Sequence, residues 1–111
     1  LKDMIVTGGE NVFSAEVESA ISTHPSVAEV AVIGIPAEQW GEAVHAIIVL
    51  KPNTILTENE VVDHCREKIA NYKLPRSISF QTEPLPLSGA GKVLKRELRK
   101  PFWDGKSRSV N

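Results

Sequence analysis

The residues best suited to chemistry lie in one stretch near the C-terminal end, Leu85–Arg99. Prolines at its start prevent regular structure, and Gly89 and Gly91 let the backbone adopt left-handed or extended conformations. Lys92 follows directly, so its ammonium group could be brought to an anion elsewhere and then withdrawn. A mobile surface loop with a solvated lysine would look the same, and the spacing alone leaves both interpretations open.

A phosphate-binding P-loop is excluded at this position. Such a loop needs Gly, four residues, Gly-Lys and then Ser or Thr, after a strand and at the start of a helix. Here Pro86 occupies the first glycine position and Val93 follows Lys92. We instead expect a short basic helix from Val93, with Leu94 and Leu98 four residues apart on one face.

The elements that must position this loop follow from the apolar pattern. Four strands are predicted, at 3–6, 28–35, 43–50 and 77–82. One helix is expected from an N-cap at Ser14 to the residues before Pro25. Thr57-Glu58-Asn59-Glu60 is a capping box, which predicts a second helix that ends before Pro75 and carries Tyr72 on its apolar side.

The predicted order is strand, helix, strand, strand, helix, strand, then loop and helix. This is a split βαβ arrangement with a ferredoxin-like order. We therefore predict an α+β domain with a central three-stranded sheet, two helices covering one face, an N-terminal hairpin and a C-terminal loop and helix. The nearly continuous apolar run 28–35 is interpreted as a central strand covered on both faces. An RNA-recognition module is rejected because the central strands carry no aromatic residue.

Bulk properties exclude several classes of protein. A length of 111 residues indicates one domain, and no apolar run approaches the 18 residues of a membrane span. The chain shows no signal peptide, and its single cysteine fits a reducing compartment, so we expect a cytoplasmic protein. Residues 1–91 carry a net charge of −6 and residues 92–108 carry +5. That basic end fits a phosphate-rich ligand, an acidic partner or simple solvation.

Two groups of polar residues are interpreted as structural. Asp63, His64 and Cys65 are adjacent on a predicted helix and point in different directions, so no metal site is expected. We predict that Cys65 is a small core residue and that His64 is solvated. His24, near a helix end, and His45, inside an apolar strand, are expected to be structural rather than catalytic.

The opening Leu-Lys-Asp-Met-Ile-Val-Thr-Gly-Gly-Glu-Asn-Val resembles the hinge motif of the adenylate-forming superfamily, which includes acyl-coenzyme A (CoA) synthetases. Pro-Leu-Ser-Gly-Ala-Gly-Lys, ending at Lys92, is similar to the last core motif of that superfamily. Trp40-Gly41-Glu42 and Tyr72-Lys73-Leu74-Pro75 lie between them, in the family's order. The resemblance covers essentially the whole chain. It implies that residues 1–111 are the mobile C-terminal domain of such an enzyme, without the N-terminal ATP- and acyl-binding domain.

The resemblance also implies an activity and a set of roles. The full enzyme would convert a carboxylic acid, ATP (with Mg²⁺) and CoA into acyl-CoA, AMP and pyrophosphate through an acyl-AMP intermediate. Lys92 would be catalytic in adenylation, and Lys2 would be the hinge. The loop containing Gly8 and Gly9 would line the thiol's path in thioesterification. Ala90 departs from the Ser or Thr of many relatives, so one hydroxyl contact is absent.

For CoA, the resemblance implies that Trp40 and Tyr72 border the adenine and that Arg76 meets a phosphate, although core or rim packing also explains both aromatic residues. The run from Phe102 to Gly105 resembles the ends of some bacterial fatty-acyl ligases, which favours a fatty acid. Alternatives are a stand-alone, non-catalytic adapter, a ligase for another carboxylic acid, or one that acylates a carrier-protein thiol. We expect residues 1–111 alone to be inactive and to bind no nucleic acid.

Overall fold

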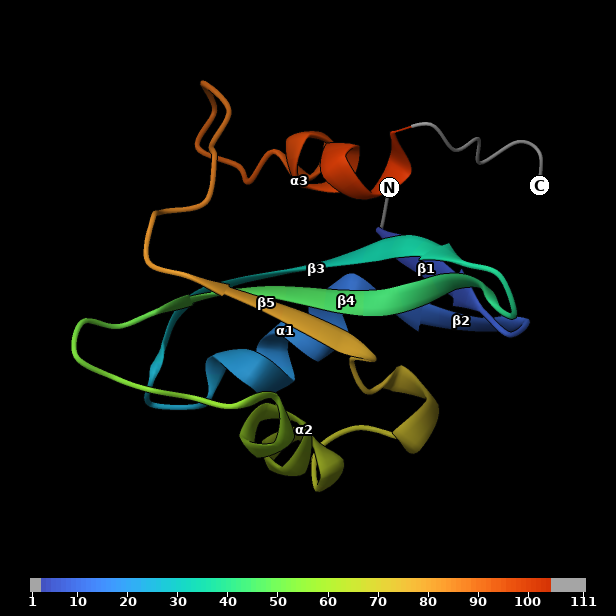
Figure 1. Cartoon of the computed structure of the whole chain (residues 1–111), viewed down its shortest axis with the longest axis horizontal. Helices are drawn as coiled ribbons and strands as arrows, with labels where there is room; N and C mark the ends of the chain where they lie inside the picture. The colour runs from blue at the N-terminus through green and yellow to red at the C-terminus, as the bar shows by residue number, and fades with distance from the viewer. Residues whose placement is uncertain (1–2, 105–111) are drawn as a thin grey trace.

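The computed structural model describes residues 3–104, so the expected hinge residue Lys2 lies outside the described residues. The elements run in the order β1 (Met4–Thr7), β2 (Glu10–Phe13), α1 (Ser14–Ser22), β3 (Val27–Ala37), β4 (Gly41–Leu50), α2 (Glu58–Arg66), the 3₁₀ turn η1 (Asn71–Lys73), β5 (Ser77–Gln81) and α3 (Lys95–Trp103). This is the predicted α+β order, in which the first predicted strand forms the predicted N-terminal hairpin together with β2 (Figure 1).

The sheet is organised around β4. β3 pairs with it in antiparallel register, and β5 pairs with it in parallel, from His45–Ser77 to Val49–Gln81. These three strands are the predicted central sheet. The hairpin β1–β2 joins through the single pair Thr7–Gly41 at the start of β4. A parallel neighbour needs a long crossover connection, which α2 and η1 supply between β4 and β5.

Two apolar clusters fill the two faces of the sheet. α1 and α2 cover one face, where Val17, Ile21 and Val61 pack against the strands, as predicted (Figure 1). α3 covers the opposite face through its half-buried Leu98 and Phe102. Successive strand residues alternate between the faces, so both clusters draw on β3 and β4.

The prediction that 28–35 forms a central strand is half right. β3 is covered on both faces, and its residues Ala31–Ile33 are fully buried. It nevertheless lies at the edge of the sheet, because it pairs only with β4. A strand covered on both faces has a continuous apolar run whether one or two strands pair with it. The run 28–35 therefore predicted that both faces are covered, and it carried no information on strand order.

Helix boundaries differ from the predictions in local ways. The Thr57 capping box is present, but α2 ends at Arg66, and Tyr72 lies on η1 with 45% of its surface exposed. Its predicted place on the apolar side of that helix is therefore wrong. α1 has Phe13 at its N-cap with no side-chain cap. Ser14 is instead buried inside the first turn, where its hydroxyl donates to Asp3 Oδ2 at 3.2 Å.

The cysteine and histidine residues interpreted as structural are mostly held within the domain. Cys65 is buried in the main core, where burial raises the pKa of its thiol. His24 accepts a hydrogen bond at Nδ1 from the Ser26 amide at 3.0 Å. His64 is partly buried rather than fully solvated, and its Nε2 lies 2.7 Å from Thr23 Oγ1. Within residues 3–104, no group of three potential ligands could hold a metal ion, and no helix has the length and apolarity to cross a membrane.

Candidate functional site

Lys92 lies on a tight hairpin formed by residues 87–93. The hairpin projects on the side of the sheet that α3 covers (Figure 1). Leu87 and Val93 form a bridge at the base of the hairpin. Above it, the Ser88 amide donates to the Lys92 carbonyl at 2.7 Å, and Gly91 turns the chain with a φ of +82°. The backbone of Lys92 is therefore held at both its carbonyl and its amide, which donates to Ser88 Oγ at 3.3 Å.

The side chain of Lys92 is exposed, and no carboxylate pairs with it among residues 3–104. Because Val93 belongs to the bridge, α3 begins at Lys95 and not at Val93 as predicted. Lys95 points back to the domain and pairs with Asp3 and Glu18, at 2.8 and 2.7 Å. An unpaired amine on an ordered hairpin is available to an external anion, and its catalytic role stays a prediction.

The second predicted loop is the β1–β2 turn. Gly8 and Gly9 have φ values of +59° and +84°, which a side chain would disfavour. The Gly8 amide donates to the Trp40 carbonyl at 2.9 Å, so the turn is docked on the β3–β4 connection. A Cβ atom on Gly8 would lie 3.5 Å from Trp40 Cδ1, whereas one on Gly9 would meet nothing within 4 Å. Gly9 is therefore the open side of this turn.

Trp40 and Arg76, predicted from the sequence as CoA residues, are in direct contact. The guanidinium carbon of Arg76 lies 3.8 Å from the centre of the Trp40 indole. The Arg76 amide donates to the Val44 carbonyl at 2.8 Å, which fixes the start of β5 beside β4. Together with Gly8, these residues form one continuous surface, named here the Gly8–Trp40–Arg76 surface.

Tyr72 makes a different contact. Its ring lies 5.5 Å from the ammonium group of Lys73, and that ammonium pairs with Glu16 of α1 at 2.8 Å. Tyr72 lies on the exposed η1 turn, four residues before Arg76. Its role in binding CoA stays a prediction.

The Lys92 hairpin and the β1–β2 turn extend toward opposite ends of the domain. In Figure 1 the hairpin rises at the upper left, whereas the β1–β2 and β3–β4 turns lie together at the right. One orientation of this domain therefore cannot present both loops to the same point on a neighbouring molecule.

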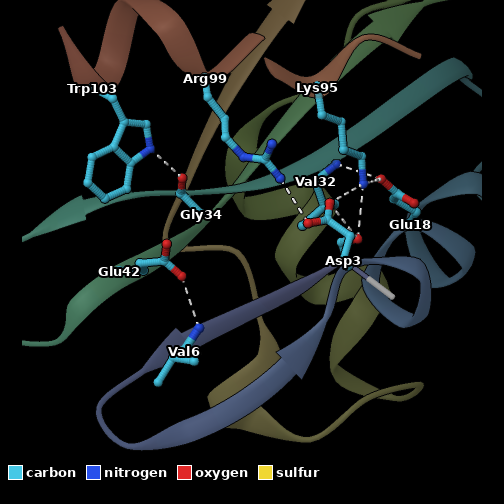
Figure 2. A network of polar contacts seen from close by, with 10 residues as sticks. Asp3, Val6, Glu18, Val32, Gly34, Glu42, Lys95, Arg99 and Trp103 are labelled. Atoms are coloured by element: carbon cyan, nitrogen blue, oxygen red, sulfur yellow. Dashed lines mark hydrogen bonds and ion pairs between the residues drawn. The ribbon is translucent and has the colours of Figure 1, made fainter. Parts of the chain in front are cut away.

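Sequence reasoning missed a polar network between the chain's two ends. It joins Asp3, before β1, with Lys95 and Arg99 of α3 and with Glu18 of α1 (Figure 2). The four-residue spacing of Lys95 and Arg99 places both cations on one side of a helix and was a usable signal. Nothing in the sequence identified their partners, because Asp3 lies more than 90 positions away.

Glu42 was also missed as a structural residue, although it belongs to a recognised motif. Its Oε1 accepts a hydrogen bond from the Val6 amide at 3.0 Å and lies over Gly34 (Figure 2). A Cβ atom on Gly34 would be 2.9 Å from that oxygen and 3.2 Å from the buried Ile5 Cγ2. Gly34 is therefore required for close packing, with no special backbone conformation.

His45 is a packed core residue, as predicted. Its two ring nitrogens lie 2.6 and 2.8 Å from the hydroxyls of Ser77 and Ser79 on β5. Phe102 of α3 covers the ring, with 4.7 Å between the ring centres. Burial lowers the pKa of His45 to about 4, so the ring is neutral near pH 7 and holds β4 to β5.

The fold and most of the sequence match the small domain of a known class of enzymes. ATP-bound MatB from Rhodopseudomonas palustris superposes with a TM-score of 0.86 at 36% identity, over 96% of this chain and 21% of that chain. Residues 16–92 match the family model of the AMP-binding enzyme C-terminal domain. The chain therefore belongs to the AMP-binding enzyme C-terminal domain family, which confirms the resemblance seen in the sequence.

Two curated relatives indicate the enzymes in which such domains occur. The long-chain-fatty-acid–CoA ligase FadD13 of Mycobacterium tuberculosis is 48% identical over 102 residues, which cover 92% of this chain and 20% of the relative. The fatty acid–[acyl-carrier-protein] ligase ScoC of Streptomyces coeruleorubidus is 40% identical over 111 residues, covering all of this chain and 21% of the relative. The chain thus spans about a fifth of the length of the curated relatives it matches.

Proposed function

We propose that this chain is the mobile C-terminal domain of an ATP-dependent fatty-acyl-CoA ligase. The rest of that ligase would hold the ATP and acyl sites and would be the partner of this domain. Family membership and the one-fifth coverage of FadD13 support the assignment. The observation that carries it is Lys92, an exposed amine without a carboxylate partner among residues 3–104, held on an ordered hairpin.

In the first half-reaction, the carboxylate oxygen of the acid attacks the α-phosphorus of ATP and pyrophosphate leaves. The two reactants are both anions, so their approach is opposed by charge. Lys92 would lie between the carboxylate and the α-phosphate and stabilise the negative charge that develops there. Its role is that of a cation and requires no proton transfer. The Mg²⁺ that accompanies ATP would be bound in the larger domain, together with the ATP phosphates.

In the second half-reaction, the thiol of CoA loses its proton and its sulfur attacks the carbonyl carbon of acyl-AMP, and AMP leaves. The Gly8–Trp40–Arg76 surface would then face the site. Gly8 and Gly9 would let the thiol arm pass close to the backbone, and Arg76 would meet a phosphate of CoA beside Trp40 and Tyr72. The two loops point toward opposite ends of the domain (Figure 1), so a rotation about Lys2 would exchange them between the half-reactions.

Lys92→Ala in the full-length enzyme tests this assignment. We expect ATP–pyrophosphate exchange to fall by about 10²–10³-fold, the usual cost of losing one such donor. Conversion of supplied acyl-AMP and CoA to acyl-CoA should change far less. Arg96→Ala is the matched control, because Arg96 is an exposed cation four residues further on. Equal loss of both half-reactions would contradict the two-orientation mechanism.

A carrier-protein thiol is the second candidate acceptor, favoured by the match to ScoC over the whole chain. The acceptor is decided by incubating the full-length enzyme with acid and ATP and adding either CoA or an acyl-carrier protein. We expect a thioester with CoA. Release of pyrophosphate by residues 1–111 alone would contradict both versions, because both place the ATP site in the larger domain.

A further inference from the structure

The carboxylate of Asp3 joins the start of the first strand to the last helix. Its Oδ2 accepts a hydrogen bond from Lys95 Nζ at 2.8 Å, and its Oδ1 accepts one from Arg99 Nη2, also at 2.8 Å (Figure 2). Asp3 follows the expected hinge residue directly in the sequence. The contact therefore connects the expected pivot of the domain to α3, with 91 residues of chain between the two partners Asp3 and Lys95.

Lys95 is held from three sides. Its ammonium group lies 2.8 Å from Asp3 Oδ2, 2.7 Å from Glu18 Oε2 and 3.0 Å from Ser14 Oγ. The contacts with Asp3 and Ser14 are hydrogen bonds and the contact with Glu18 is an ion pair, so the ammonium group has three oxygen partners at once. The same Glu18 oxygen accepts a hydrogen bond from the Val32 amide at 2.8 Å, which anchors the network to β3 (Figure 2).

The network is more than a solvated surface pair. The exposed fractions of the four charged side chains lie between 19% for Lys95 and 31% for Asp3. Partial burial alone would raise the pKa of Asp3, but hydrogen bonding and charge from Lys95, with the charge of Arg99, outweigh it and lower the pKa. Two carboxylates face two cations, so the group is neutral as a whole and each charge is paired.

The two ends of α3 are held by different means. No residue of the helix is fully buried. Near its C-terminal end, Trp103 Nε1 donates to the Gly34 carbonyl at 2.9 Å, and Phe102 packs on His45. Its first turn is held by the half-buried Leu98, which packs against the core, and by the ion pairs of Lys95 with Asp3 and Glu18. That turn begins three residues after Lys92, and the Leu94 amide closes the hairpin on the Pro86 carbonyl at 2.9 Å.

We propose that Asp3 is a positioning residue for adenylation, because it fixes the first turn of α3, and with it the Lys92 hairpin, relative to the hinge. The proposal rests on the proposed function of Lys92 and adds a requirement to it. A rotation about the hinge brings Lys92 to one position only if the link from the hinge through Asp3 and the first turn of α3 to the hairpin is rigid. This link is called the arm below. The β1–β2 turn does not need this arm, because Ile5 in the core and the Thr7–Gly41 pair hold it.

Asp3→Asn in the full-length enzyme tests the proposal. The amide keeps the shape of the side chain but loses its charge, and Lys95 retains Glu18 as a partner. Misplacement by about 1 Å costs on the order of 10²-fold in rate. We expect ATP–pyrophosphate exchange to fall by about 10-fold or more, within that limit. Conversion of supplied acyl-AMP and CoA should change by less than about 2-fold, since the Gly8–Trp40–Arg76 surface is held independently.

Glu16→Gln is the matched control. It also replaces a carboxylate by an amide in this domain, and it breaks the ion pair of Glu16 with Lys73, which takes no part in the network. We expect both half-reactions to stay unchanged. Arg99→Met is the second Asp3 test, because it removes only one of the two cations bound to Asp3 and should give an intermediate loss of adenylation. Thermal unfolding of each variant establishes that the enzyme is folded at the assay temperature.

Hydrogen exchange of the full-length variants measures the arm directly. Asp3→Asn should raise exchange in peptides covering 87–99 and leave peptides covering 27–50 unchanged. Unchanged exchange at 87–99, or an equal loss of both half-reactions, would overturn the proposal. Lys92→Ala in the same assays separates the two ideas. If Lys92→Ala leaves adenylation intact, the proposed function fails, even where exchange shows that Asp3 holds the hairpin.

Discussion

The guanidinium group of Arg76 lies 3.8 Å above the indole of Trp40, and the carbonyl of Trp40 accepts the amide of Gly8 at 2.9 Å. Three residues from the N-terminal turn, the β3–β4 connection and the start of β5 thereby form one surface. The stack restrains a long, exposed side chain, so the Arg76 charge has a defined position. A phosphate-bearing ligand would meet a preorganised cation there.

We predict that Arg76→Ala raises the KM for CoA in the full-length enzyme by about 10-fold, equivalent to about 1.4 kcal/mol. The physical reason is the loss of a charge-assisted contact with phosphate. Trp40→Ala should have a related effect because it releases the same side chain, and the double variant should lose less than the sum. The measurement is the rate of thioester formation against CoA concentration. An unchanged KM in both single variants would remove this surface from the CoA site.

Gly9→Ala should separate backbone strain from packing. A Cβ atom on Gly9 meets nothing within 4 Å, but the residue has a φ of +84°. We expect a loss of about 1–2 kcal/mol in the free energy of unfolding, from the left-handed conformation alone. Urea denaturation measures it, and Gly89→Ala is the control, since Gly89 has open space and no positive φ. Equal stability of the two variants would contradict the strain argument.

Gly34→Ala should destabilise the domain through steric crowding, without backbone strain. The new Cβ atom would lie 2.9 Å from Glu42 Oε1 and 3.2 Å from Ile5 Cγ2. Glu42 would have to leave the Val6 amide, and Ile5 is buried and cannot move freely. We expect a loss of about 1–3 kcal/mol, typical of overpacking, measured by urea denaturation. Adding Glu42→Ala should relieve only part of it, because the contact with Ile5 remains; full recovery would show that Glu42 alone sets the limit.

Stability should fall in mild acid because of His45. Its folded pKa is about 4 and its ordinary value is 6.5, so the unfolded chain binds the proton more readily. The stabilisation is fully present above pH 6.5 and is lost as the pH falls toward 4, by at most about 3 kcal/mol. Urea denaturation of the 111-residue chain between pH 7.5 and pH 4.5 measures it. His45→Gln should flatten this dependence, and an unchanged slope would assign it to other groups.

Much of the fold could be predicted from the sequence because local rules and burial dominate it. The capping box at Thr57 was confirmed, since its two hydrogen bonds join residues three apart. The apolar run 28–35 predicted that β3 is buried on both faces, as observed. The position of β3 at the edge of the sheet could not be predicted. The apolar pattern of a strand reports which of its faces are covered, and it does not report which strands pair with it.

For the candidate site, the sequence determined which residue types are available: a lysine after a glycine loop, a Gly-Gly turn, and aromatic residues near an arginine. Their resemblance to a family of enzymes was sufficient to predict that family, and the comparisons confirm it. Tertiary structure alone decided that Trp40 and Arg76 stack and that Asp3 holds α3. Those contacts join residues far apart in the chain, and only the folded sheet brings their charges and rings within a few ångströms.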